Sequence, residues 1–165
     1  MAIEMFVFSD RQLNSIAEWQ TAIDAEGFPL KLKDVNFVEL CGFLPALLNG
    51  EPTGFECYHD LGDDFIREAE DLNFDHAWKF VCGFRWIGDF YEFQAAWMAG
   101  AAYAVATNGI VLDDESGTFL GAVEAREEAR KIIRDMPELE AIMRKLDPTR
   151  PQRVQELRAR WSEKR

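Results

Sequence analysis

The sequence predicts a single α+β domain, in which one long buried helix crosses a mixed, mostly antiparallel sheet of five or six strands. Three features of the 165 residues point to this fold. Residues 78–86 alternate between two faces as a strand does, residues 90–106 are almost entirely apolar, and short strand-like and helix-like segments fill the rest. We expect the domain to cover residues 1–147 and a basic helical tail to cover residues 148–165.

The alternating segment predicts one strand with a heavily aromatic face, because successive side chains of a strand point to opposite sides. That face would carry Trp78, Phe80, Cys82, Phe84 and Trp86. The opposite face is mixed in character. We expect the aromatic face to be buried in the core, together with aromatic residues of the long helix.

The apolar segment predicts a helix at about residues 89–107. Asp89 can cap its N-terminus, with Glu92 three residues later as in a capping box. Asn108 and the glycine after it tolerate a left-handed backbone and would end the helix. A helix that is apolar on all sides lies in a protein core or in a membrane. Its seven alanines, Gly100 and the polar residues of its first turns favour the core, so we expect no membrane segment.

The N-terminal part predicts a strand, a helix and a second strand. Residues 5–8 are all apolar, which is typical of an interior strand. Ser9, followed three residues later by Gln12, predicts a capped helix that ends near Gly27. Residues 30–33 alternate leucine with lysine, which predicts a short strand near a sheet edge.

A hairpin is expected next, with strands at residues 43–48 and 55–59. The dipeptide Asn49-Gly50 is the strongest short hairpin signal. Four more residues precede the second strand, so we expect a loop longer than two residues. A kinked helix over residues 36–48 is the alternative to the first of these strands.

The rest of the chain predicts mostly helices. An acidic helix is expected at residues 63–72, a strand at 110–112 and a polar turn at 113–117. Charged amphipathic helices are expected at 120–134 and 137–146, separated because proline cannot continue a helix comfortably.

The charge of the chain is strongly uneven. The net charge is −12 overall, −15 for residues 1–120 and +3 for residues 121–165. An acidic body does not bind nucleic acid by neutralising phosphates, but it attracts a basic protein partner over long range. Solubility alone is the other explanation of the charge. The candidate partner-binding residues are Asp60, Asp63, Asp64, Glu68, Asp71, Asp113, Asp114 and Glu115.

The tail has the opposite charge, with a net charge of +4 over residues 150–165. Val154, Leu157 and Trp161 would form one apolar stripe if the tail is helical. We therefore expect the tail to pack on the acidic body, either within one chain or across a homodimer.

A metal site is one hypothesis for the two histidines, His59 and His76, which have acidic neighbours including Asp75. Imidazole and carboxylate ligands suit zinc or iron. The chain has no HExxH, HxH or CxxC spacing, and a strand stripe of Phe55, Cys57 and His59 would partly bury His59. We therefore expect no cofactor. For the metal hypothesis, the candidate ligands are His59, His76 and Asp75.

Other catalytic chemistry has no recognisable motif. The chain lacks GxSxG, GxxxxGK[ST] and GxGxxG, so no catalytic residue is assigned. Asp113, Asp114 and Glu115 could hold Mg²⁺ after a strand, but a solvated turn explains them more simply. Three cysteines and no basic, apolar export signal favour a cytoplasmic protein with reduced thiols.

One resemblance covers about residues 40–130. The runs GFLP at 42–45, NG at 49–50, TGFE at 53–56 and TNGIVLD at 107–113 are each mostly turns and core positions. Together with the Ala-rich helix and a following Glu/Ala helix, they resemble small uncharacterised bacterial proteins found among the immunity proteins of polymorphic toxin systems. The resemblance implies a partner-binding role, and no catalytic residues carry over from it. Together with the acidic charge, this favours a binding protein that masks a basic partner. A small metal-dependent enzyme using His59, His76 and nearby Asp residues is the alternative hypothesis.

Overall fold

The computed structural model describes residues 2–69, 71–152, 155–156 and 159. It contains seven strands and four helices in these residues. In chain order they are β1 Ile3–Ser9, α1 Ile16–Ala25, β2 Leu30–Leu32, β3 Gly42–Leu48, β4 Glu51–Leu61, α2 Gly62–Glu68, β5 Phe80–Trp86, α3 Phe90–Thr107, β6 Ile110–Asp113, β7 Thr118–Gly121 and α4 Ala122–Leu146.

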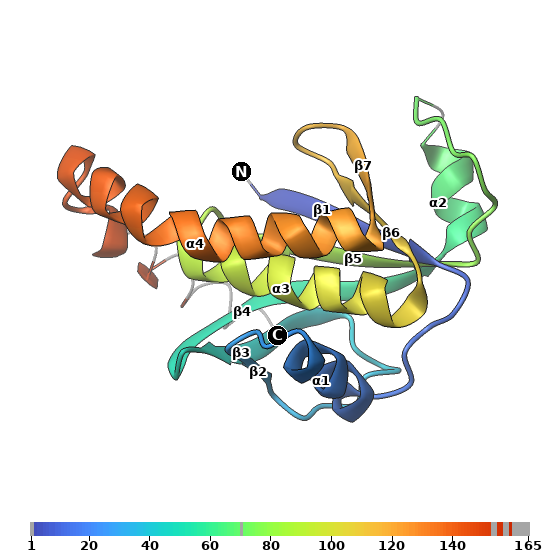
Figure 1. Ribbon diagram of the computed structural model, residues 1–165, viewed down its shortest axis with the longest axis horizontal. Helices are drawn as coiled ribbons and strands as arrows, with labels where there is room; N and C mark the ends of the chain where they lie inside the picture. Colours follow the sequence, from blue (N-terminus) through green and yellow to red (C-terminus); the bar gives the residue numbers. More distant parts are fainter. Residues whose placement is uncertain (1, 70, 153–154, 157–158, 160–165) are drawn as a thin grey trace.

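The strands form one sheet in the order β2-β3-β4-β5-β1-β6-β7, and the six neighbouring pairs are all antiparallel. Helices α1, α3 and α4 cover one face, which we call the inner face, and α2 lies toward the other, the outer face (Figure 1). The α+β prediction is confirmed. The sheet has one strand more than expected, and it is wholly antiparallel rather than mixed.

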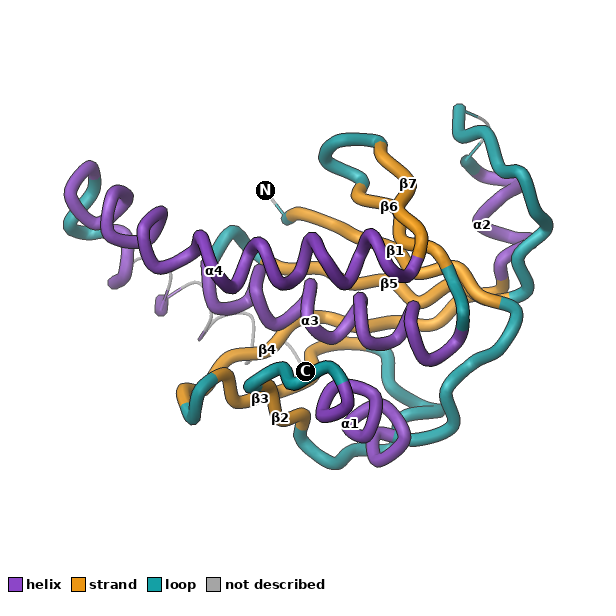
Figure 2. The backbone as a smooth tube through the Cα atoms, viewed as in Figure 1, coloured by secondary structure: helices purple, strands orange, loops and turns teal. Residues whose placement is uncertain are grey.

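Helix α3 lies at the centre of the inner face, between α1 and α4 (Figure 2). Its N-cap is Asp89, whose side chain accepts a hydrogen bond from the Tyr91 amide at 3.1 Å, as expected. Asn108 ends the helix in the left-handed conformation with φ of 53°. A Cβ atom on Gly100 would lie 2.4 Å from the Met5 methyl group, so the small residue permits close packing on β1.

Helix α1 is joined to α3 by Trp19, which is fully buried. Its indole nitrogen donates a hydrogen bond to the Ala99 carbonyl of α3 at 2.9 Å. Its ring also meets Phe84 of β5 and Tyr103 of α3 edge-on, at centroid distances of 5.8 and 5.4 Å. A single side chain therefore connects α1, α3 and the central strand.

The aromatic strand is shorter than expected. Cys82, Phe84 and Trp86 are buried in the inner core as predicted. Phe80 is only partly buried, and Trp78 precedes the strand and packs on the outer face. The expectation that Trp78 shares the inner face was therefore wrong, because the chain leaves the strand alternation before Phe80.

The β3–β4 hairpin corrects the predicted loop. Leu48 pairs with Glu51, so the connection is the two residues Asn49 and Gly50 alone. Their φ angles of 52° and 80° are both positive, as a type I′ turn requires. The strand at 43–48 is confirmed against the helical alternative, and β4 begins four residues earlier than expected.

The first helix begins later than predicted. Ser9 belongs to β1, where it pairs with Phe80, so it does not cap a helix. The cap is Ser15, whose hydroxyl accepts from the Glu18 amide at 3.0 Å. The intervening residues carry the chain from the sheet onto its inner face.

The C-terminal part differs from expectation at two places. Residues 118–121 form β7, paired with β6, where a helix was predicted to start. Helix α4 then continues through Pro137 as a single helix of 25 residues. Up to Met136 its buried side chains pack on the core, but Leu139 and Ile142 are 45% and 47% exposed. The proline therefore falls where α4 leaves the body of the protein (Figure 1).

The beginning of the tail contacts α3. Arg150 donates a hydrogen bond to the Gly88 carbonyl at 2.8 Å, and its guanidinium lies 5.3 Å from the centroid of the Phe90 ring. The predicted apolar stripe of Val154, Leu157 and Trp161 lies outside the described residues. Among the described helices, none has the length and apolar character needed to span a membrane.

Replacing Phe84 by Ala should lower the free energy of unfolding by about 3–5 kcal/mol, the usual cost of removing a buried phenylalanine ring. Phe84 is fully buried, whereas Phe80 two residues earlier is partly exposed. Phe80→Ala should therefore cost clearly less in the same urea titration. Equal losses in the two variants would show that the inner face is assigned wrongly.

Candidate functional site

The outer face of the sheet carries a second, smaller hydrophobic cluster. Phe6 and Phe8 of β1 are buried there under Phe65 of α2, at centroid distances of 4.7 and 5.1 Å. Phe74, in the loop after α2, contacts Phe8 at 5.1 Å and Phe119 of β7 at 5.3 Å. These rings fix α2 and its following loop to the sheet.

The segment fixed in this way is acidic. Residues 60–79 contain seven Asp or Glu residues and two Lys or Arg residues. Five of the acidic residues are described and exposed, and we call them the acidic surface: Asp60, Asp64, Glu68, Asp71 and Asp75. Arg67 pairs with Asp64 at 2.7 Å, with both side chains more than half exposed. The predicted site residue Asp63 lies in α2, but its side chain is outside the part that the structure describes.

A histidine and an aspartate from distant parts of the chain meet beside the acidic surface. The His76 Nε2 atom lies 2.7 Å from Asp10 Oδ2, and the His76 ring packs edge-on against Trp78 at 4.6 Å. The Lys79 amide donates to the other Asp10 oxygen at 3.2 Å. The hydrogen bond with His76 is the main cause of a lowered pKa of the Asp10 carboxyl. Asp10 was not predicted from the sequence, because it lies 66 residues from His76 along the chain.

The second predicted acidic group forms the β6–β7 turn. The two carboxylate oxygens of Asp113 accept hydrogen bonds from the Glu115 amide at 3.2 Å and the Ser116 hydroxyl at 2.8 Å. Asp114 and Glu115 are exposed. Asp113 therefore stabilises the turn, and the hairpin projects on the same side of the molecule as α2 (Figure 1).

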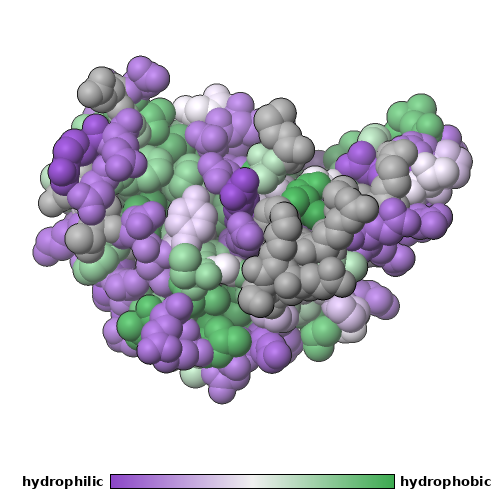
Figure 3. All heavy atoms as spheres, turned by 180° about the vertical axis from the view of Figure 1, so that it is seen from behind, coloured by the Kyte–Doolittle hydropathy of each residue, from purple (hydrophilic) through white to green (hydrophobic). Residues whose placement is uncertain are grey.

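Seen from behind, the molecule has a mixed surface (Figure 3). Hydrophilic residues gather at the left edge of this view, which is the side of α2, and hydrophobic residues show between them. The half-buried aromatic residues Tyr58, Phe74 and Trp78 belong to the outer cluster. Carboxylates and aromatic side chains therefore occur together on the outer face.

A different group of side chains meets on the inner face. Cys57 and His59 lie two residues apart on β4, and Cys82 of β5 is paired in register with His59. One ligand atom of each residue lies within 4.8 Å of the other two, and the two sulfur atoms are 3.6 Å apart. We call these three residues the thiol–imidazole cluster. The remaining cysteine, Cys41, is exposed.

Burial determines the ionisation of this cluster. Burial raises the pKa of the Cys82 thiol, and the contact with Cys57 adds to the effect. Burial lowers the pKa of His59, although a hydrogen bond with the Phe37 backbone partly opposes this. At neutral pH the Cys82 thiol is therefore protonated and the His59 imidazole is neutral. A thiol pair and a neutral imidazole are together a soft ligand set for a metal ion.

The structure separates the two histidines that the sequence had grouped. The His59 ring contacts Phe37 of the inner core at 4.6 Å, whereas His76 and Asp75 lie by the outer cluster. A single site using both histidines is therefore not formed. The partner that the sequence missed is Cys82, because its register opposite His59 depends on strand pairing.

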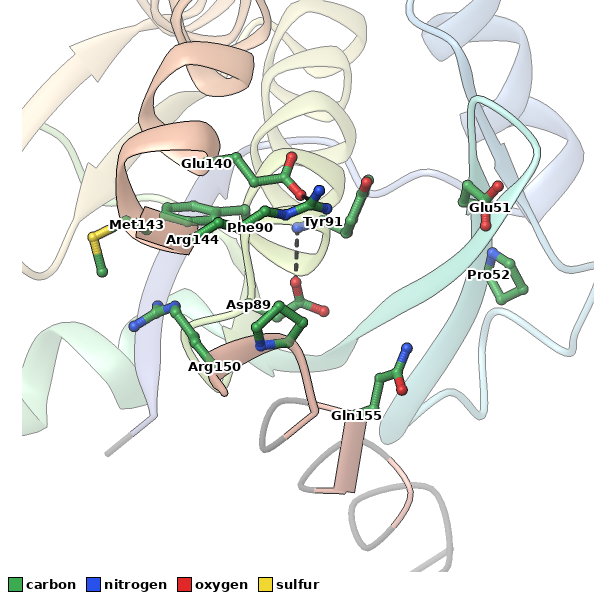
Figure 4. A pocket seen from close by; sticks show the side chains of 11 residues that line it. Glu51, Pro52, Asp89, Phe90, Tyr91, Glu140, Met143, Arg144, Arg150 and Gln155 are labelled. Carbon is green, nitrogen blue, oxygen red and sulfur yellow. Dashed lines mark hydrogen bonds and ion pairs between the residues drawn. The ribbon is translucent and has the colours of Figure 1, made fainter. Parts of the chain in front are cut away.

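A cavity lies between the β3–β4 hairpin, the start of α3 and the end of α4 (Figure 4). Its volume is about 260 Å³. Its lining residues are Glu51, Pro52, Asp89, Phe90, Tyr91, Glu140, Met143, Arg144, Arg150, Pro151 and Gln155. Arg144 pairs with Glu140 at 2.6 Å, and Arg150 binds the Gly88 carbonyl. The two arginines of this cavity therefore already contact groups of the chain itself.

Near this cavity, Glu92 is a buried acid in the first turn of α3. Its side chain is 1% exposed, and Oε2 accepts a hydrogen bond from the Ile87 amide at 3.2 Å. In a capping box, the Glu92 side chain would accept a hydrogen bond from the Asp89 amide. This expectation was wrong, because the Glu92 side chain accepts from the Ile87 amide. Burial raises the pKa of Glu92 from 4.5 to about 7.

Comparisons with family models, with curated proteins and with solved structures found no match to this chain.

The Glu92 variant Glu92→Gln should change how stability depends on pH. The pKa of Glu92 is higher in the folded state than in the unfolded state. The contribution of Glu92 to the free energy of unfolding is therefore fully present below about pH 4.5 and is lost as the pH rises through about 7. The free energy of unfolding of Glu92→Gln, relative to the natural protein, should therefore rise by up to about 3 kcal/mol between pH 4.5 and 8.

The measurement is urea denaturation at several pH values across that range. Glu124→Gln is the matched control, since Glu124 lies exposed in the first turn of α4. The difference from the natural protein should change with pH more for Glu92→Gln than for this control. A Glu92→Gln difference that stays constant with pH would contradict the raised pKa of Glu92.

Proposed function

We propose that this protein is a cytoplasmic binding protein that masks a basic protein partner with its acidic surface. The observation that carries the proposal is the concentration of exposed carboxylates on α2 and its flanking residues, a segment fixed to the outer face by aromatic packing. Because the segment is anchored, its charges keep a defined arrangement before a partner arrives.

The chemistry of this surface suits association with a cation-rich protein. Complementary charge raises the rate of encounter and rejects partners of the same sign. Only Arg67 and Lys79 offset the acidic residues of segment 60–79. The half-buried rings of Tyr58, Phe74 and Trp78 supply the kind of aromatic anchor that dominates protein interfaces. Charge would therefore steer the partner, and the rings would hold it.

The resemblance to immunity proteins supports the same kind of role, because an immunity protein blocks the active surface of a toxin. We include Asp113, Asp114 and Glu115 as a secondary contact, since Phe119 of the same hairpin packs against Phe74 in the loop after α2 at 5.3 Å. The alternative, a metal-dependent enzyme using His59 and His76, has less support because those residues lie on opposite faces of the sheet.

The test compares the natural protein with a variant in which Asp60, Asp64, Glu68 and Asp71 are changed to Asn or Gln. Each protein is immobilised, cross-linked in host extract and analysed by quantitative mass spectrometry. A basic protein recovered with the natural chain should be depleted from the variant. With the purified pair, the association rate should fall about tenfold at low salt and depend less on salt concentration.

A second variant controls for net charge. It changes four exposed acidic residues outside the acidic surface to Asn or Gln, so that the net charge rises by the same amount as in the first variant. These residues are Asp34, Glu39, Glu124 and Glu138. It should bind the partner as the natural protein does. If both variants lose the partner equally, or neither does, the acidic surface has no specific role and its charge serves solubility.

We also propose that the basic tail supports a homodimer, as its charge suggests. Arg150 contributes the contacts with Gly88 and Phe90 described above. Deleting residues 149–165 should therefore lower the melting temperature, and light scattering should show the mass falling from dimer to monomer. A monomeric full-length protein would contradict the dimer, and an unchanged melting temperature would contradict a structural role for the tail.

A further inference from the structure

The thiol–imidazole cluster has a feature that ordinary core packing does not explain. The Nε2 atom of His59 is buried and has no hydrogen-bond partner in the described part of the chain. Burying a polar nitrogen without a partner is unfavourable, because the atom loses its hydrogen bond to water. Two sulfur atoms and this imidazole nevertheless gather on the same face of two paired strands.

We propose that Cys57, His59 and Cys82 bind a single thiophilic metal ion of the Zn²⁺ class. This site lies on the inner face of the sheet, and it is independent of the acidic surface on the outer face.

The spacing of the sulfur atoms supports the proposal. Two thiolates bound to one tetrahedral zinc at about 2.3 Å lie about 3.8 Å apart. The Cys57 and Cys82 sulfurs are 3.6 Å apart. The ligand atom of His59 lies within 4.8 Å of both sulfurs, so the three ligand atoms are close enough together to share one ion.

The strand register explains why these three side chains meet. Residues two apart on a strand share a face, which places Cys57 and His59 together on β4. Cys82 is directly opposite His59 on β5, and β5 is held between β4 and β1 in the middle of the sheet. The ligands are therefore positioned by a rigid element rather than by a loop, as a preorganised metal site requires.

The chemistry of the three ligands selects the metal. Thiolate and imidazole bind zinc and other soft or borderline cations, whereas Mg²⁺ and Ca²⁺ prefer oxygen ligands. On binding, each S–H bond breaks, a metal–sulfur bond forms, and the two protons pass to solvent. The step involves no oxidation or reduction.

Cobalt(II) is a suitable probe, because its bonds to thiolate give absorption bands in the near ultraviolet. The full chain, reduced with a phosphine and freed of metal with a chelator, is titrated with Co²⁺ and then with Zn²⁺. We expect one Co²⁺ per chain with thiolate bands, displacement by Zn²⁺, and a higher melting temperature with metal. X-ray absorption at the cobalt edge should show two sulfur ligands.

Four variants test the residues. Cys57→Ser, Cys82→Ser and His59→Gln should weaken Co²⁺ binding by more than about 100-fold, since loss of an outer-shell partner alone costs 10–100-fold. Cys41→Ser is the matched control, because Cys41 is exposed and outside the cluster, and it should bind as the natural protein does. Circular dichroism checks that each variant is folded.

The outcomes separate the possibilities. No thiolate band in the natural protein, or a cobalt edge with only nitrogen and oxygen ligands, overturns the proposal even if a variant fails to fold. Binding that survives in folded Cys57→Ser and Cys82→Ser but disappears in Cys41→Ser also overturns it. The variant in which Asp60, Asp64, Glu68 and Asp71 are changed to Asn or Gln should bind Co²⁺ as the natural protein does. The proposed metal site and the proposed partner-binding function can therefore fail independently.

Discussion

The close packing of α3 on the central strands is the constraint on which the rest of the fold depends. Alanines and Gly100 let its backbone approach β1, where Met5 fills the space beside the glycine. A helix so deeply placed cannot cover the whole face by itself, so α1 and α4 pack along its two sides. Trp19 then joins α1 to α3 and to the sheet in one buried contact. The three helices therefore exclude water from the inner face as a unit.

This arrangement gives the two faces of the sheet different chemistry. The inner face is closed, and burial there raises the pKa of Glu92 and of Cys82. Among the described residues, the short helix α2 and the loop after it cover the small cluster of the outer face, and the acidic residues around that cluster are exposed. The proposed recognition surface therefore lies on the outer face, and the proposed metal site lies on the inner one.

The sequence predicted those features that depend on neighbouring residues. The cap at Asp89, the end of α3 at Asn108 and the strand ending at Trp86 are local in this sense. The prediction from sequence failed where strand pairing determines the structure. Residues 118–121 form the strand β7 because they pair with β6. The same reason explains the sites, since Asp10 reaches His76 and Cys82 reaches His59 only after the sheet has formed. The exposed acidic residues were predictable because charge and solvation follow from composition.

The lengths of the strands vary across the sheet. The two outermost strands, β2 and β7, have three and four residues, whereas β4 inside the sheet has eleven. Short edge strands leave few unpaired backbone amides and carbonyls to which a strand of another chain could pair. The molecule is thus protected against edge-to-edge aggregation, and a partner that binds it must recognise side chains instead of adding a strand.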